Sequence, residues 1–477
     1  MLTLADVFEA LINIRPAIDP TIITEAAIDS RQSIPGSLFV AIPGEHVDGH
    51  DFVADAFQRG ASFALIQHQL DQKYPVIDLR SAPVAGLRDL PASFEHSPLC
   101  LLVENTITSL QTIARFWRRK LDLRVVGITG SVGKSTTKEL IAEVLGQRYH
   151  TLKSPGNLNN EIGLPLTILR LGSGYERAVL EMGFYVPGEI AFLCDIALPQ
   201  IGVVTNIGTV HAERAGSQEA IAYGKSELVQ ALPAAPEGVA VLNYDDPWVR
   251  PMAERTKARV FYYGLDPASD LWADQVEGLG LEGIRFRLHY QSETLHVHVP
   301  MIGQHSVHTA LRAAAVGLVD GLTWQEVING LQASHTQLRL VAVRTEAGAL
   351  MLDDTYNASP ESMLAALNLL SELDGNKVAV LGDMLELGPY EKQGHEIVGV
   401  RVAEVADRLV TVGSRGHIIA DAARRTGMPS DRVDEFENSD DAILFLRGSL
   451  IDSDVVLVKG SHDVHMDHIA AALEVIK

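Results

Sequence analysis

The feature that most constrains this chain is a glycine-rich turn between a predicted strand and a predicted helix. The strand RVVGI begins at Arg124, and the turn runs Gly127-Ile-Thr-Gly130-Ser-Val-Gly133-Lys134-Ser135. Such a turn points backbone N–H groups at phosphate, and the helix N-terminus adds a favourable dipole. Lys134 would reach the terminal phosphates of a nucleotide, and the Ser135 hydroxyl would ligate Mg²⁺. The pattern therefore predicts a nucleoside triphosphate site in a parallel α/β domain.

The spacing of the glycines departs from the strict phosphate-loop pattern. That pattern places its first glycine five residues before Gly133, where this chain has Ile128. The alternative interpretation is a glycine-rich turn followed by Lys-Ser by chance. The order strand, turn and helix favours the nucleotide site over this alternative.

The rest of the chain divides into three regions by pattern. Its 477 residues predict about three domains at roughly 150 residues each. We expect boundaries at 1–105, 106–335 and 336–477, because short apolar strands alternate with helical segments from Arg124 onward and again from Gln337. Residues 71–98 predict a loop-rich insertion, and the alternating pattern of 284–299 predicts an antiparallel hairpin. The expected fold is α/β with a central P-loop domain built on a parallel sheet.

Charge and hydropathy exclude several classes of protein. Lys and Arg number 39 against 61 Asp and Glu, so the net charge is −22. A nucleic-acid-binding surface needs a basic stripe, and we expect none here. The chain begins without a secretory signal pattern and carries no apolar run near the ~20 residues of a membrane span. We therefore expect a cytoplasmic protein.

Further motifs occur in a fixed order along nearly the whole chain, and together with the turn they resemble the Mur ligase family. Two of these motifs, DDTYNASP (353–360) and LGDMLELG (381–388), resemble specifically its D-alanyl-D-alanine-adding type, the MurF type. The motifs are IDSR (28–31), LFVAIPGEHVDGHDF (38–52), GITGSVGKST (127–136), GNLNNEIGLPLTIL (156–169), LEMG (180–183), TNIGTVHAERAGSQEAIAYGKSEL (205–228), DDTYNASP (353–360) and LGDMLELG (381–388).

The resemblance implies an enzyme with ATP and Mg²⁺ as cofactors. It would join D-alanyl-D-alanine to UDP-N-acetylmuramoyl-tripeptide through an acyl phosphate, in peptidoglycan precursor synthesis, and would act as a monomer. An N-terminal domain would bind the UDP end, the central domain would bind ATP, and a Rossmann-like C-terminal domain would bring the dipeptide. The resemblance implies neither a nucleic-acid partner nor a membrane span.

The resemblance also implies a set of catalytic and metal-binding residues. Lys134 would act on the phosphates, and Ser135, Glu181 and His211 would hold Mg²⁺. Lys225 would join them if it is carbamylated, as the matching lysine is in several relatives. From the residues alone, Glu181 could instead be a solvated carboxylate, His211 a structural histidine and Lys225 a solvated helix lysine.

The remaining site residues follow from the same resemblance. ATP would contact Gly127, Thr129, Gly130, Ser131, Val132, Gly133, Lys134, Ser135, Thr136, Arg339 and Asp353. The substrates would contact Ser30, Arg31, Gly44, Asp48, Gly49, His50, Asn159, Asn160, Tyr356 and Asn357. For the asparagines, turn formation and helix capping are the alternative.

The chain also departs from the family. Ser306 and Thr309 stand where the family has asparagines that contact adenine, and His462 follows Lys-Gly-Ser where the family has arginine. Arginine gives a rigid, permanently charged fork that histidine lacks. Two other functions therefore stay open: a sister Mur ligase that adds a different amino acid, and a non-catalytic nucleotide-binding paralogue.

Overall fold

The computed structural model describes residues 1–477 except 19, 45, 71–73, 81–97, 334–340 and 476–477. Its contacts divide the chain into two compact units. The first comprises Met1–Gly127, Tyr149–Gly183 and Glu189–Ile201, and the second comprises Ile128–Arg148, Phe184–Gly188 and Gly202–Lys477. The described strands form sheets of five, nine and six strands.

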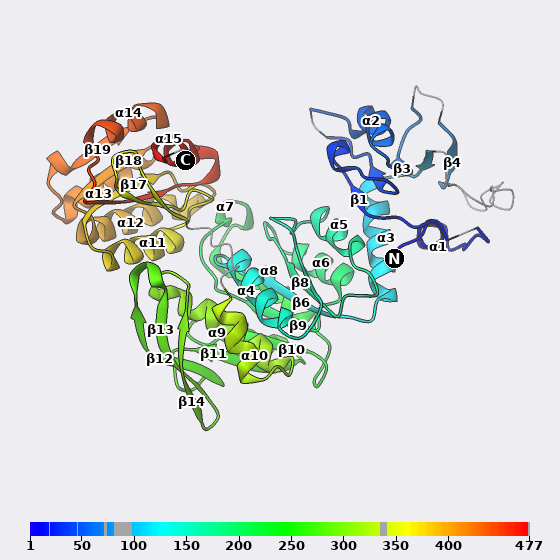
Figure 1. The fold of residues 1–477 in the computed structure, drawn as a ribbon, viewed down its shortest axis with the longest axis horizontal. Coiled ribbons are helices and arrows are strands. Elements are labelled where there is room, and N and C mark those ends of the chain that lie inside the picture. Colours follow the sequence, from blue (N-terminus) through cyan, green and yellow to red (C-terminus); the bar gives the residue numbers. More distant parts are fainter. Residues whose placement is uncertain (19, 45, 71–73, 81–97, 334–340, 476–477) are drawn as a thin grey trace. The chain divides into compact units, whose positions relative to one another are not determined.

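The amino-terminal sheet is parallel and has the strand order β1-β2-β3-β5-β4 (Figure 1). Strands β2, β3 and β5 are buried along their full length, as expected for continuous apolar runs. Phe39, Ala64 and Cys100 from these strands pack with Val53 and Ala56 of α2. The elements are β1 (Ala26–Ala27), β2 (Leu38–Val40), β3 (Phe63–Ile66), β4 (Val76–Asp78), β5 (Leu99–Leu102), α1 (Leu4–Ile12), α2 (Val53–Gln58) and α3 (Thr106–Lys120).

Strand β4 lies within the predicted loop-rich insertion, residues 71–98. Val76–Asp78 pair in parallel with β5 at the edge of the sheet. Two of the three residues of β4 are exposed, so the strand has no apolar run that the sequence could reveal. Residues 71–73 and 81–97 lie outside the described part of the chain.

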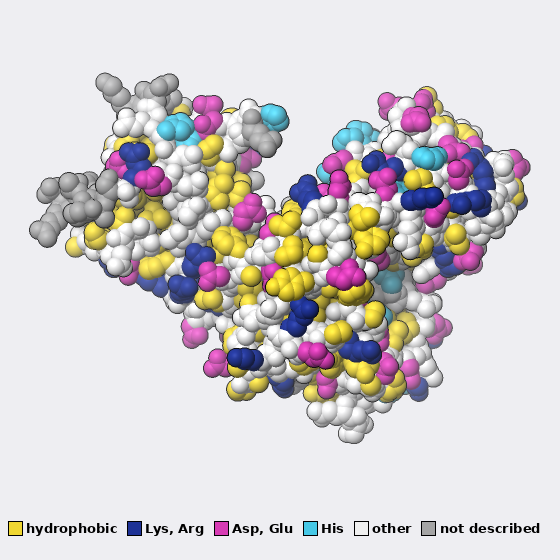
Figure 2. All heavy atoms as spheres, turned by 180° about the vertical axis from the view of Figure 1, so that it is seen from behind, with side chains coloured by type: hydrophobic (Ala, Val, Ile, Leu, Met, Phe, Trp, Pro, Cys, Tyr) yellow, Lys and Arg dark blue, Asp and Glu magenta, His cyan; other side chains and the backbone are white. Residues whose placement is uncertain are grey.

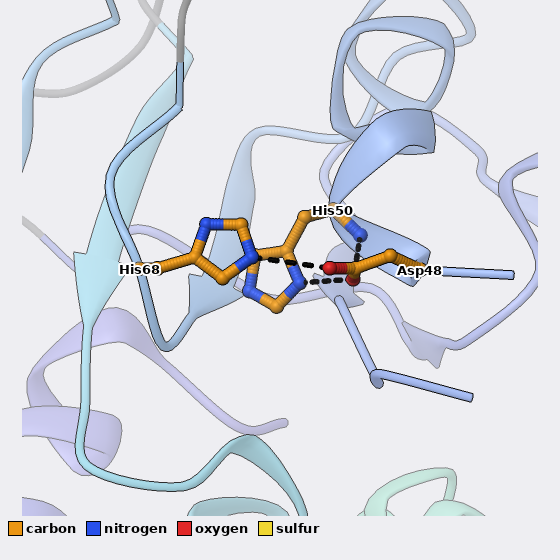
Figure 3. Close-up of side chains that lie close together, drawn as sticks. All are labelled: Asp48, His50 and His68. Carbon is orange, nitrogen blue, oxygen red and sulfur yellow. Dashed lines mark hydrogen bonds and ion pairs between the residues drawn. The ribbon is translucent and has the colours of Figure 1, made fainter. Parts of the chain in front are cut away.

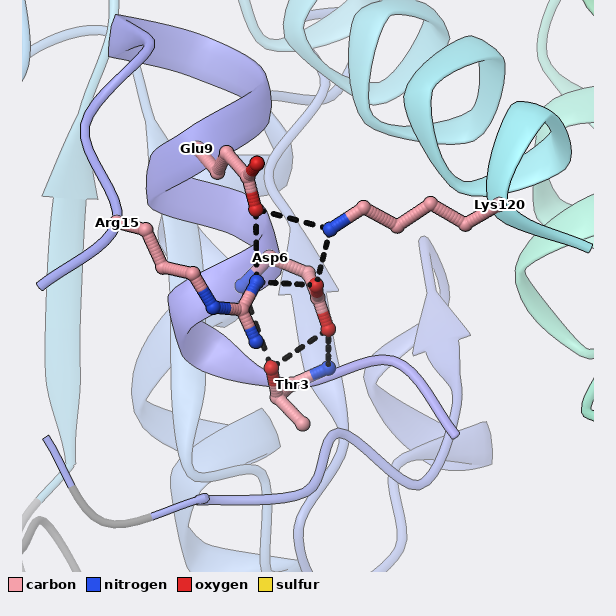
Figure 4. Close-up of polar contacts among 5 residues, drawn as sticks. All are labelled: Thr3, Asp6, Glu9, Arg15 and Lys120. Atoms are coloured by element: carbon pink, nitrogen blue, oxygen red, sulfur yellow. Dashed lines mark hydrogen bonds and ion pairs between the residues drawn. The ribbon is translucent and has the colours of Figure 1, made fainter. Parts of the chain in front are cut away.

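An ion-pair network fastens α1 to the end of α3 within the first unit (Figure 4). Asp6 closes a capping box with Thr3 and accepts hydrogen bonds from Arg15 Nη1 at 2.7 Å and from Lys120 Nζ at 2.9 Å. Glu9 accepts from the same two cations. Burial alone would raise the pKa of Asp6, but the hydrogen bonds from Thr3, Arg15 and Lys120 outweigh it and hold that pKa well below its usual range.

We expect Asp6→Asn to lower the free energy of unfolding by ~2 kcal/mol at neutral pH, because hydrogen bonds to charged groups contribute about 1.5–3 kcal/mol. The folded-state pKa is depressed, so this stabilisation is present above the unfolded pKa of about 3.9 and is lost as the pH falls below it. Calorimetric unfolding of both proteins between pH 7 and pH 3 should show their difference narrowing in acid. A difference that stays constant would contradict an ionic role.

The largest sheet has the strand order β14-β13-β12-β11-β10-β9-β6-β8-β7. Strands β10, β11 and β12 pair in parallel, and so do β7 and β8. The hairpin predicted over 284–299 is confirmed, since β13 and β14 pair antiparallel with Phe286 and Leu288 buried. The strands are β6 (Arg124–Thr129), β7 (Thr151–Lys153), β8 (Arg177–Glu181), β9 (Ile201–Val204), β10 (Val239–Asn243), β11 (Arg259–Gly264), β12 (Leu271–Gly278), β13 (Ile284–Tyr290) and β14 (Glu293–Val299).

Helices accompany this sheet in both units. The first unit holds α5 (Gly163–Leu169) and α6 (Glu189–Ala197), and the second holds α4 (Lys134–Gly146), α7 (Ala212–Ala215), α8 (Gln218–Gln230), α9 (Val307–Val319) and α10 (Trp324–Gln332). In the second unit, α4 packs against α9 and α10. This packing places the start of α4, and with it the glycine-rich turn, close to the start of α9.

The carboxyl-terminal sheet has the strand order β15-β16-β20-β17-β18-β19, with β15 antiparallel and the other neighbours parallel. Helices α11, α12 and α13 cover one face, and α14 and α15 cover the other (Figure 1). Two-sided burial is the arrangement of a Rossmann-like domain. The elements are β15 (Val341–Arg344), β16 (Leu350–Asp353), β17 (Asn376–Gly382), β18 (Arg408–Val412), β19 (Val433–Phe436), β20 (Asp454–Lys459), α11 (Pro360–Glu372), α12 (Glu391–Val405), α13 (Gly416–Thr426), α14 (Ser439–Ser449) and α15 (Met466–Leu473).

The molecular surface mixes charges of both signs. On the face drawn in Figure 2, lysine and arginine side chains lie among aspartates and glutamates rather than in one broad basic area. Within the described ranges, no helix combines the length and the apolar character that crossing a bilayer requires.

Candidate active site

The glycine-rich turn has the geometry that its sequence predicts. It links the buried strand β6 to α4, and Gly133, with φ 80°, is the N-cap of that helix. Gly130 has φ 147°, and a Cβ atom there would lie 1.8 Å from Thr205 Oγ1. Both positions therefore require glycine, one for its left-handed backbone and the other also for close approach. The predicted order of strand, turn and helix is confirmed.

Two residues that follow β9 brace this turn, and neither was predicted individually. Asn206 Oδ1 accepts a hydrogen bond from Val132 N at 2.9 Å, and its backbone oxygen accepts one from Ser131 N at 2.9 Å. Thr205 Oγ1 donates to Val132 O at 2.7 Å. The dipeptide Thr-Asn after an apolar strand was the available signal. These bonds hold the turn open in a defined shape, which a phosphate site needs.

Two lysine side chains converge on one carbonyl oxygen of the turn. Lys134 Nζ donates to Gly130 O at 2.9 Å, and Lys225 Nζ donates to the same oxygen at 3.1 Å. Lys225 lies on α8, is 1% exposed, and its ammonium sits 4.7 Å from the centre of the Phe184 ring. The alternative of a solvated helix lysine is therefore wrong for Lys225. A buried lysine beside a phosphate turn is a functional candidate.

Glu181 is the last residue of β8 and is 2% exposed, so the alternative of a solvated carboxylate is also wrong. Its Oε1 accepts a hydrogen bond from Asn159 Nδ2 at 3.0 Å, and its backbone N–H donates to Ser154 Oγ. Asn160 behaves differently, because its Oδ1 accepts from Gly163 N at 2.8 Å at the start of α5. Asn159 thus orients the predicted metal ligand, whereas Asn160 makes the turn-forming contact that was its alternative.

His211 lies in a left-handed turn, with φ 66°, immediately before α7. Its Nδ1 is 2.6 Å from Glu386 Oε2, and the Tyr185 ring meets it edge-on at 4.9 Å. Glu386 belongs to the LGDMLELG motif, yet it was not predicted as a partner of the histidine. A carboxylate on one ring nitrogen fixes the tautomer and the orientation of the ring.

The predicted UDP-binding residues Asp48 and His50 form a compact cluster with His68 (Figure 3). Gln67 N–H donates to His50 Nε2 at 3.0 Å, so the proton of this buried ring is on Nδ1, which lies 2.6 Å from Asp48 Oδ1. His68 Nε2 is 3.1 Å from Asp48 Oδ2, and the two rings stack at 3.9 Å. The backbone hydrogen bond from His50 and those of both imidazoles lower the pKa of Asp48 to about 2. Both nitrogens of His50 are therefore used within the protein, and the cluster holds Asp48 and His50 against Gln67.

The other predicted residues of the first unit are of two kinds. Ser30 is buried in a short 3₁₀ turn, while Arg31 is exposed and pairs with Asp29 at 2.7 Å. Gly44 and Gly49 sit where a Cβ atom would lie within 2.8 Å of backbone atoms of neighbouring residues. The glycines therefore allow the close approach of neighbouring backbone. Arg31, in contrast, has a charged side chain that is exposed to solvent.

The predicted residues of the second unit after β16 form a turn held by Lys459. Lys459 Nζ, which is buried, donates to Asp354 Oδ2 at 2.7 Å and to Asn357 O at 2.8 Å. Asp353 Oδ1 accepts from Thr355, and Tyr356 is exposed. The contact of Asp353 with Thr355 is therefore one that forms a turn. Arg339 lies outside the described residues.

The comparisons with known proteins identify the family. Residues 128–317 match the Mur ligase middle domain, 338–462 the Mur ligase glutamate ligase domain, and 22–89 the Mur ligase family catalytic domain. A UDP-N-acetylmuramoyl-tripeptide–D-alanyl-D-alanine ligase of Bacillus subtilis (strain 168) is 34% identical over 462 residues, which cover 96% of this chain and 94% of that protein. The chain belongs to the Mur ligase family.

Other members of the Mur ligase family agree with this assignment. The ligase of the same description from Escherichia coli (strain K12) is 33% identical over 94% of this chain and 92% of its own. The crystal structure of MurF from Acinetobacter baumannii matches with a TM-score of 0.83, 29% identity and 98% coverage of both chains. MurF ligase from Thermotoga maritima in complex with ADP matches with a TM-score of 0.77 and 27% identity, over 95% of this chain and 98% of that one. These findings confirm the three-domain α/β fold.

Proposed function

We propose that this chain joins D-alanyl-D-alanine to UDP-N-acetylmuramoyl-tripeptide with hydrolysis of ATP to ADP and phosphate, in peptidoglycan precursor synthesis. The observation that carries the proposal is the full-length match to ligases of that description, combined with a braced glycine turn on which Lys134 and Lys225 converge. We also propose that it acts as a monomer in the cytoplasm, where nucleotide-linked substrates are found, and that its domains are 1–105, 106–335 and 336–477.

The reaction has two steps. The terminal carboxylate oxygen of the tripeptide attacks the γ-phosphorus of ATP, and the bond from that phosphorus to the bridging oxygen breaks. ADP departs, and the tripeptide becomes an acyl phosphate. The amine of D-alanyl-D-alanine then attacks the acyl carbon and loses a proton as the amide bond forms and phosphate departs. Phosphoryl transfer depends mainly on positioning and charge neutralisation. The backbone N–H groups of the turn and the ammonium of Lys134 are suited to both tasks.

The donors present fit a divalent cation. Mg²⁺ prefers hard oxygen ligands, and Glu181 offers a buried carboxylate at the end of β8 while Ser135 offers a hydroxyl in the first turn of α4. His211 would contribute Nε2, because its Nδ1 faces Glu386. When bound, Mg²⁺ supplies positive charge that offsets the negative charge of the phosphates.

We expect Glu181→Gln to raise the Mg²⁺ concentration needed for half-maximal activity by about tenfold or more. The change removes a negative charge with almost no change of shape, and Mg²⁺ is bound through carboxylate oxygens. Even changes to residues that only orient a metal ligand typically cost about 10- to 100-fold in metal affinity. A Mg²⁺ titration of phosphate release measures the effect. Glu104→Gln serves as the control, because it makes the same change at an exposed glutamate of the same unit. An unchanged Mg²⁺ curve for Glu181→Gln would contradict the metal assignment.

One assay separates the proposed function from its alternatives. Phosphate release from ATP is measured with UDP-N-acetylmuramoyl-tripeptide, with and without D-alanyl-D-alanine. Sustained release that requires both substrates supports the proposal. Release that requires a different amino acid in place of the dipeptide identifies a sister ligase. Nucleotide binding without any turnover identifies the non-catalytic paralogue suggested by Ser306, Thr309 and His462.

A further inference from the structure

Arg312, on α9, is a buried cation whose hydrogen bonds are incomplete. The residue is only 4% exposed. Nε donates to His308 O at 3.0 Å and Nη2 donates to Thr309 Oγ1 at 3.0 Å. Nη1 is buried and has no hydrogen-bond partner among the described residues. A guanidinium carries five N–H donors in a fixed fork, so this nitrogen has donors left for another group.

The positive charge of Arg312 also lacks a partner of opposite charge among the described residues. No carboxylate of the described chain forms an ion pair with it, since Asp245, which lies near the start of α9, is instead 2.9 Å from His308 Nε2. The aromatic ring of Tyr263 is 5.9 Å away. Burial lowers the pKa of the guanidinium, which reflects the cost of keeping this charge away from water. A buried cation without an anion is costly, so a bound anion would stabilise it.

The position of Arg312 indicates which anion this is. A Cβ atom placed on Gly133 would lie 3.6 Å from Nη1 and 3.8 Å from Nη2 of Arg312. The free face of the guanidinium therefore adjoins the last glycine of the phosphate turn, where α4 begins. Arginine is suited to phosphate because its planar fork binds two oxygens at once.

Two small hydroxyl side chains precede Arg312 in the sequence. Ser306 and Thr309 carry small hydroxyl side chains where the family has asparagines, and Thr309 Oγ1 accepts from Arg312. Ser306 donates to Ile302 O and so is turned toward its own backbone.

We propose that Arg312 binds the nucleotide in this protein, with its Nη1 donating to an oxygen of the phosphate chain. The inference rests on the proposed function only in that the 127–136 turn binds ATP.

The test is ADP binding to the full-length protein by calorimetry. Arg312→Gln should weaken ADP binding about 10- to 100-fold, the range for one hydrogen bond to a charged group. Arg312→Lys keeps the charge but loses the fork, so its loss should be smaller. Affinity for UDP-N-acetylmuramoyl-tripeptide should be unchanged in both. Lys134→Ala is measured in parallel: if it weakens ADP binding and Arg312→Gln does not, the role of Arg312 is refuted while the ATP site stands. If neither variant weakens ADP binding, the assignment of the turn itself fails.

Thermal unfolding distinguishes a ligand-binding arginine from a structural one. Arg118 is the matched control, because it is equally buried but its guanidinium donates to the carbonyl oxygens of Ala197, Leu121 and Leu123. Arg118→Gln should lower the Tm of the nucleotide-free protein and keep the full increase in Tm on adding ADP. Arg312→Gln should keep the Tm of the nucleotide-free protein and lose most of that increase. The reverse pattern would overturn the proposal.

Discussion

Lys134→Ala is expected to lower kcat by about 10² to 10³, the usual loss when a group that stabilises a transferring phosphoryl is removed. The reason is local: Lys134 follows the last glycine of the turn, and its ammonium already lies 2.9 Å from Gly130 O. Affinity for UDP-N-acetylmuramoyl-tripeptide should stay within twofold, because the predicted UDP-binding residues lie in the first unit and Lys134 in the second. Steady-state kinetics and calorimetric titration measure the two quantities.

The control for this variant is Lys257→Ala, which removes an exposed lysine from the same unit. It should leave kcat and both affinities unchanged, since exposed substitutions away from special features usually have effects within about 0.5 kcal/mol. Near-wild-type turnover by Lys134→Ala would refute the assignment of the phosphate turn.

Lys225→Ala is expected to lose activity by about 10²-fold or more, because a carbamate on this lysine would supply a negative oxygen ligand next to the phosphate turn. An ammonium at this position faces Gly130 O together with Lys134, so two positive charges share one carbonyl. Carbamylation of Lys225 would remove that like-charge contact. Acetate should restore part of the activity of Lys225→Ala by filling the vacated anion site, whereas bicarbonate should restore none.

Lys225→Arg is the matched control, because it keeps the positive charge but cannot form the carbamate. If carbamylation of Lys225 is required, Lys225→Arg should be as inactive as Lys225→Ala. Labelling with ¹³C-bicarbonate should then give a carbamate resonance in the wild-type protein and in neither variant. If the positive charge matters instead, Lys225→Arg should keep much of its activity and no carbamate resonance should appear. Circular dichroism and Tm of each variant establish that the buried substitution has not unfolded the protein.

The local backbone structure of the site could be predicted from the sequence. The strand, turn and helix around Gly130 and Gly133 could be predicted because left-handed backbone and close approach both demand glycine, and few other residues satisfy them. The hairpin at 284–299 could be predicted because one face is buried and the other is more exposed to solvent, which gives an alternating pattern of apolar and polar residues. Strand β4 could not, because an exposed edge strand has no hydrophobic period.

The tertiary structure decided which side chains are buried and what they contact. The residue pattern alone left solvated side chains as alternatives for Lys225 and Glu181, and only the fold places these residues at 1% and 2% exposure. Arg312 lies 179 positions after Gly133 in the sequence, and the packing of α9 on α4 brings the two together.

What the sequence by itself determined is therefore the order of elements and the phosphate-binding turn, since both depend on short-range backbone geometry and hydrophobic periodicity. What only the tertiary structure decided is the pairing of distant groups: His211 with Glu386, Asn159 with Glu181, and Arg312 with the turn. Such pairings depend on how helices and strands pack, and no periodicity in the chain encodes which of many charged residues will be desolvated together.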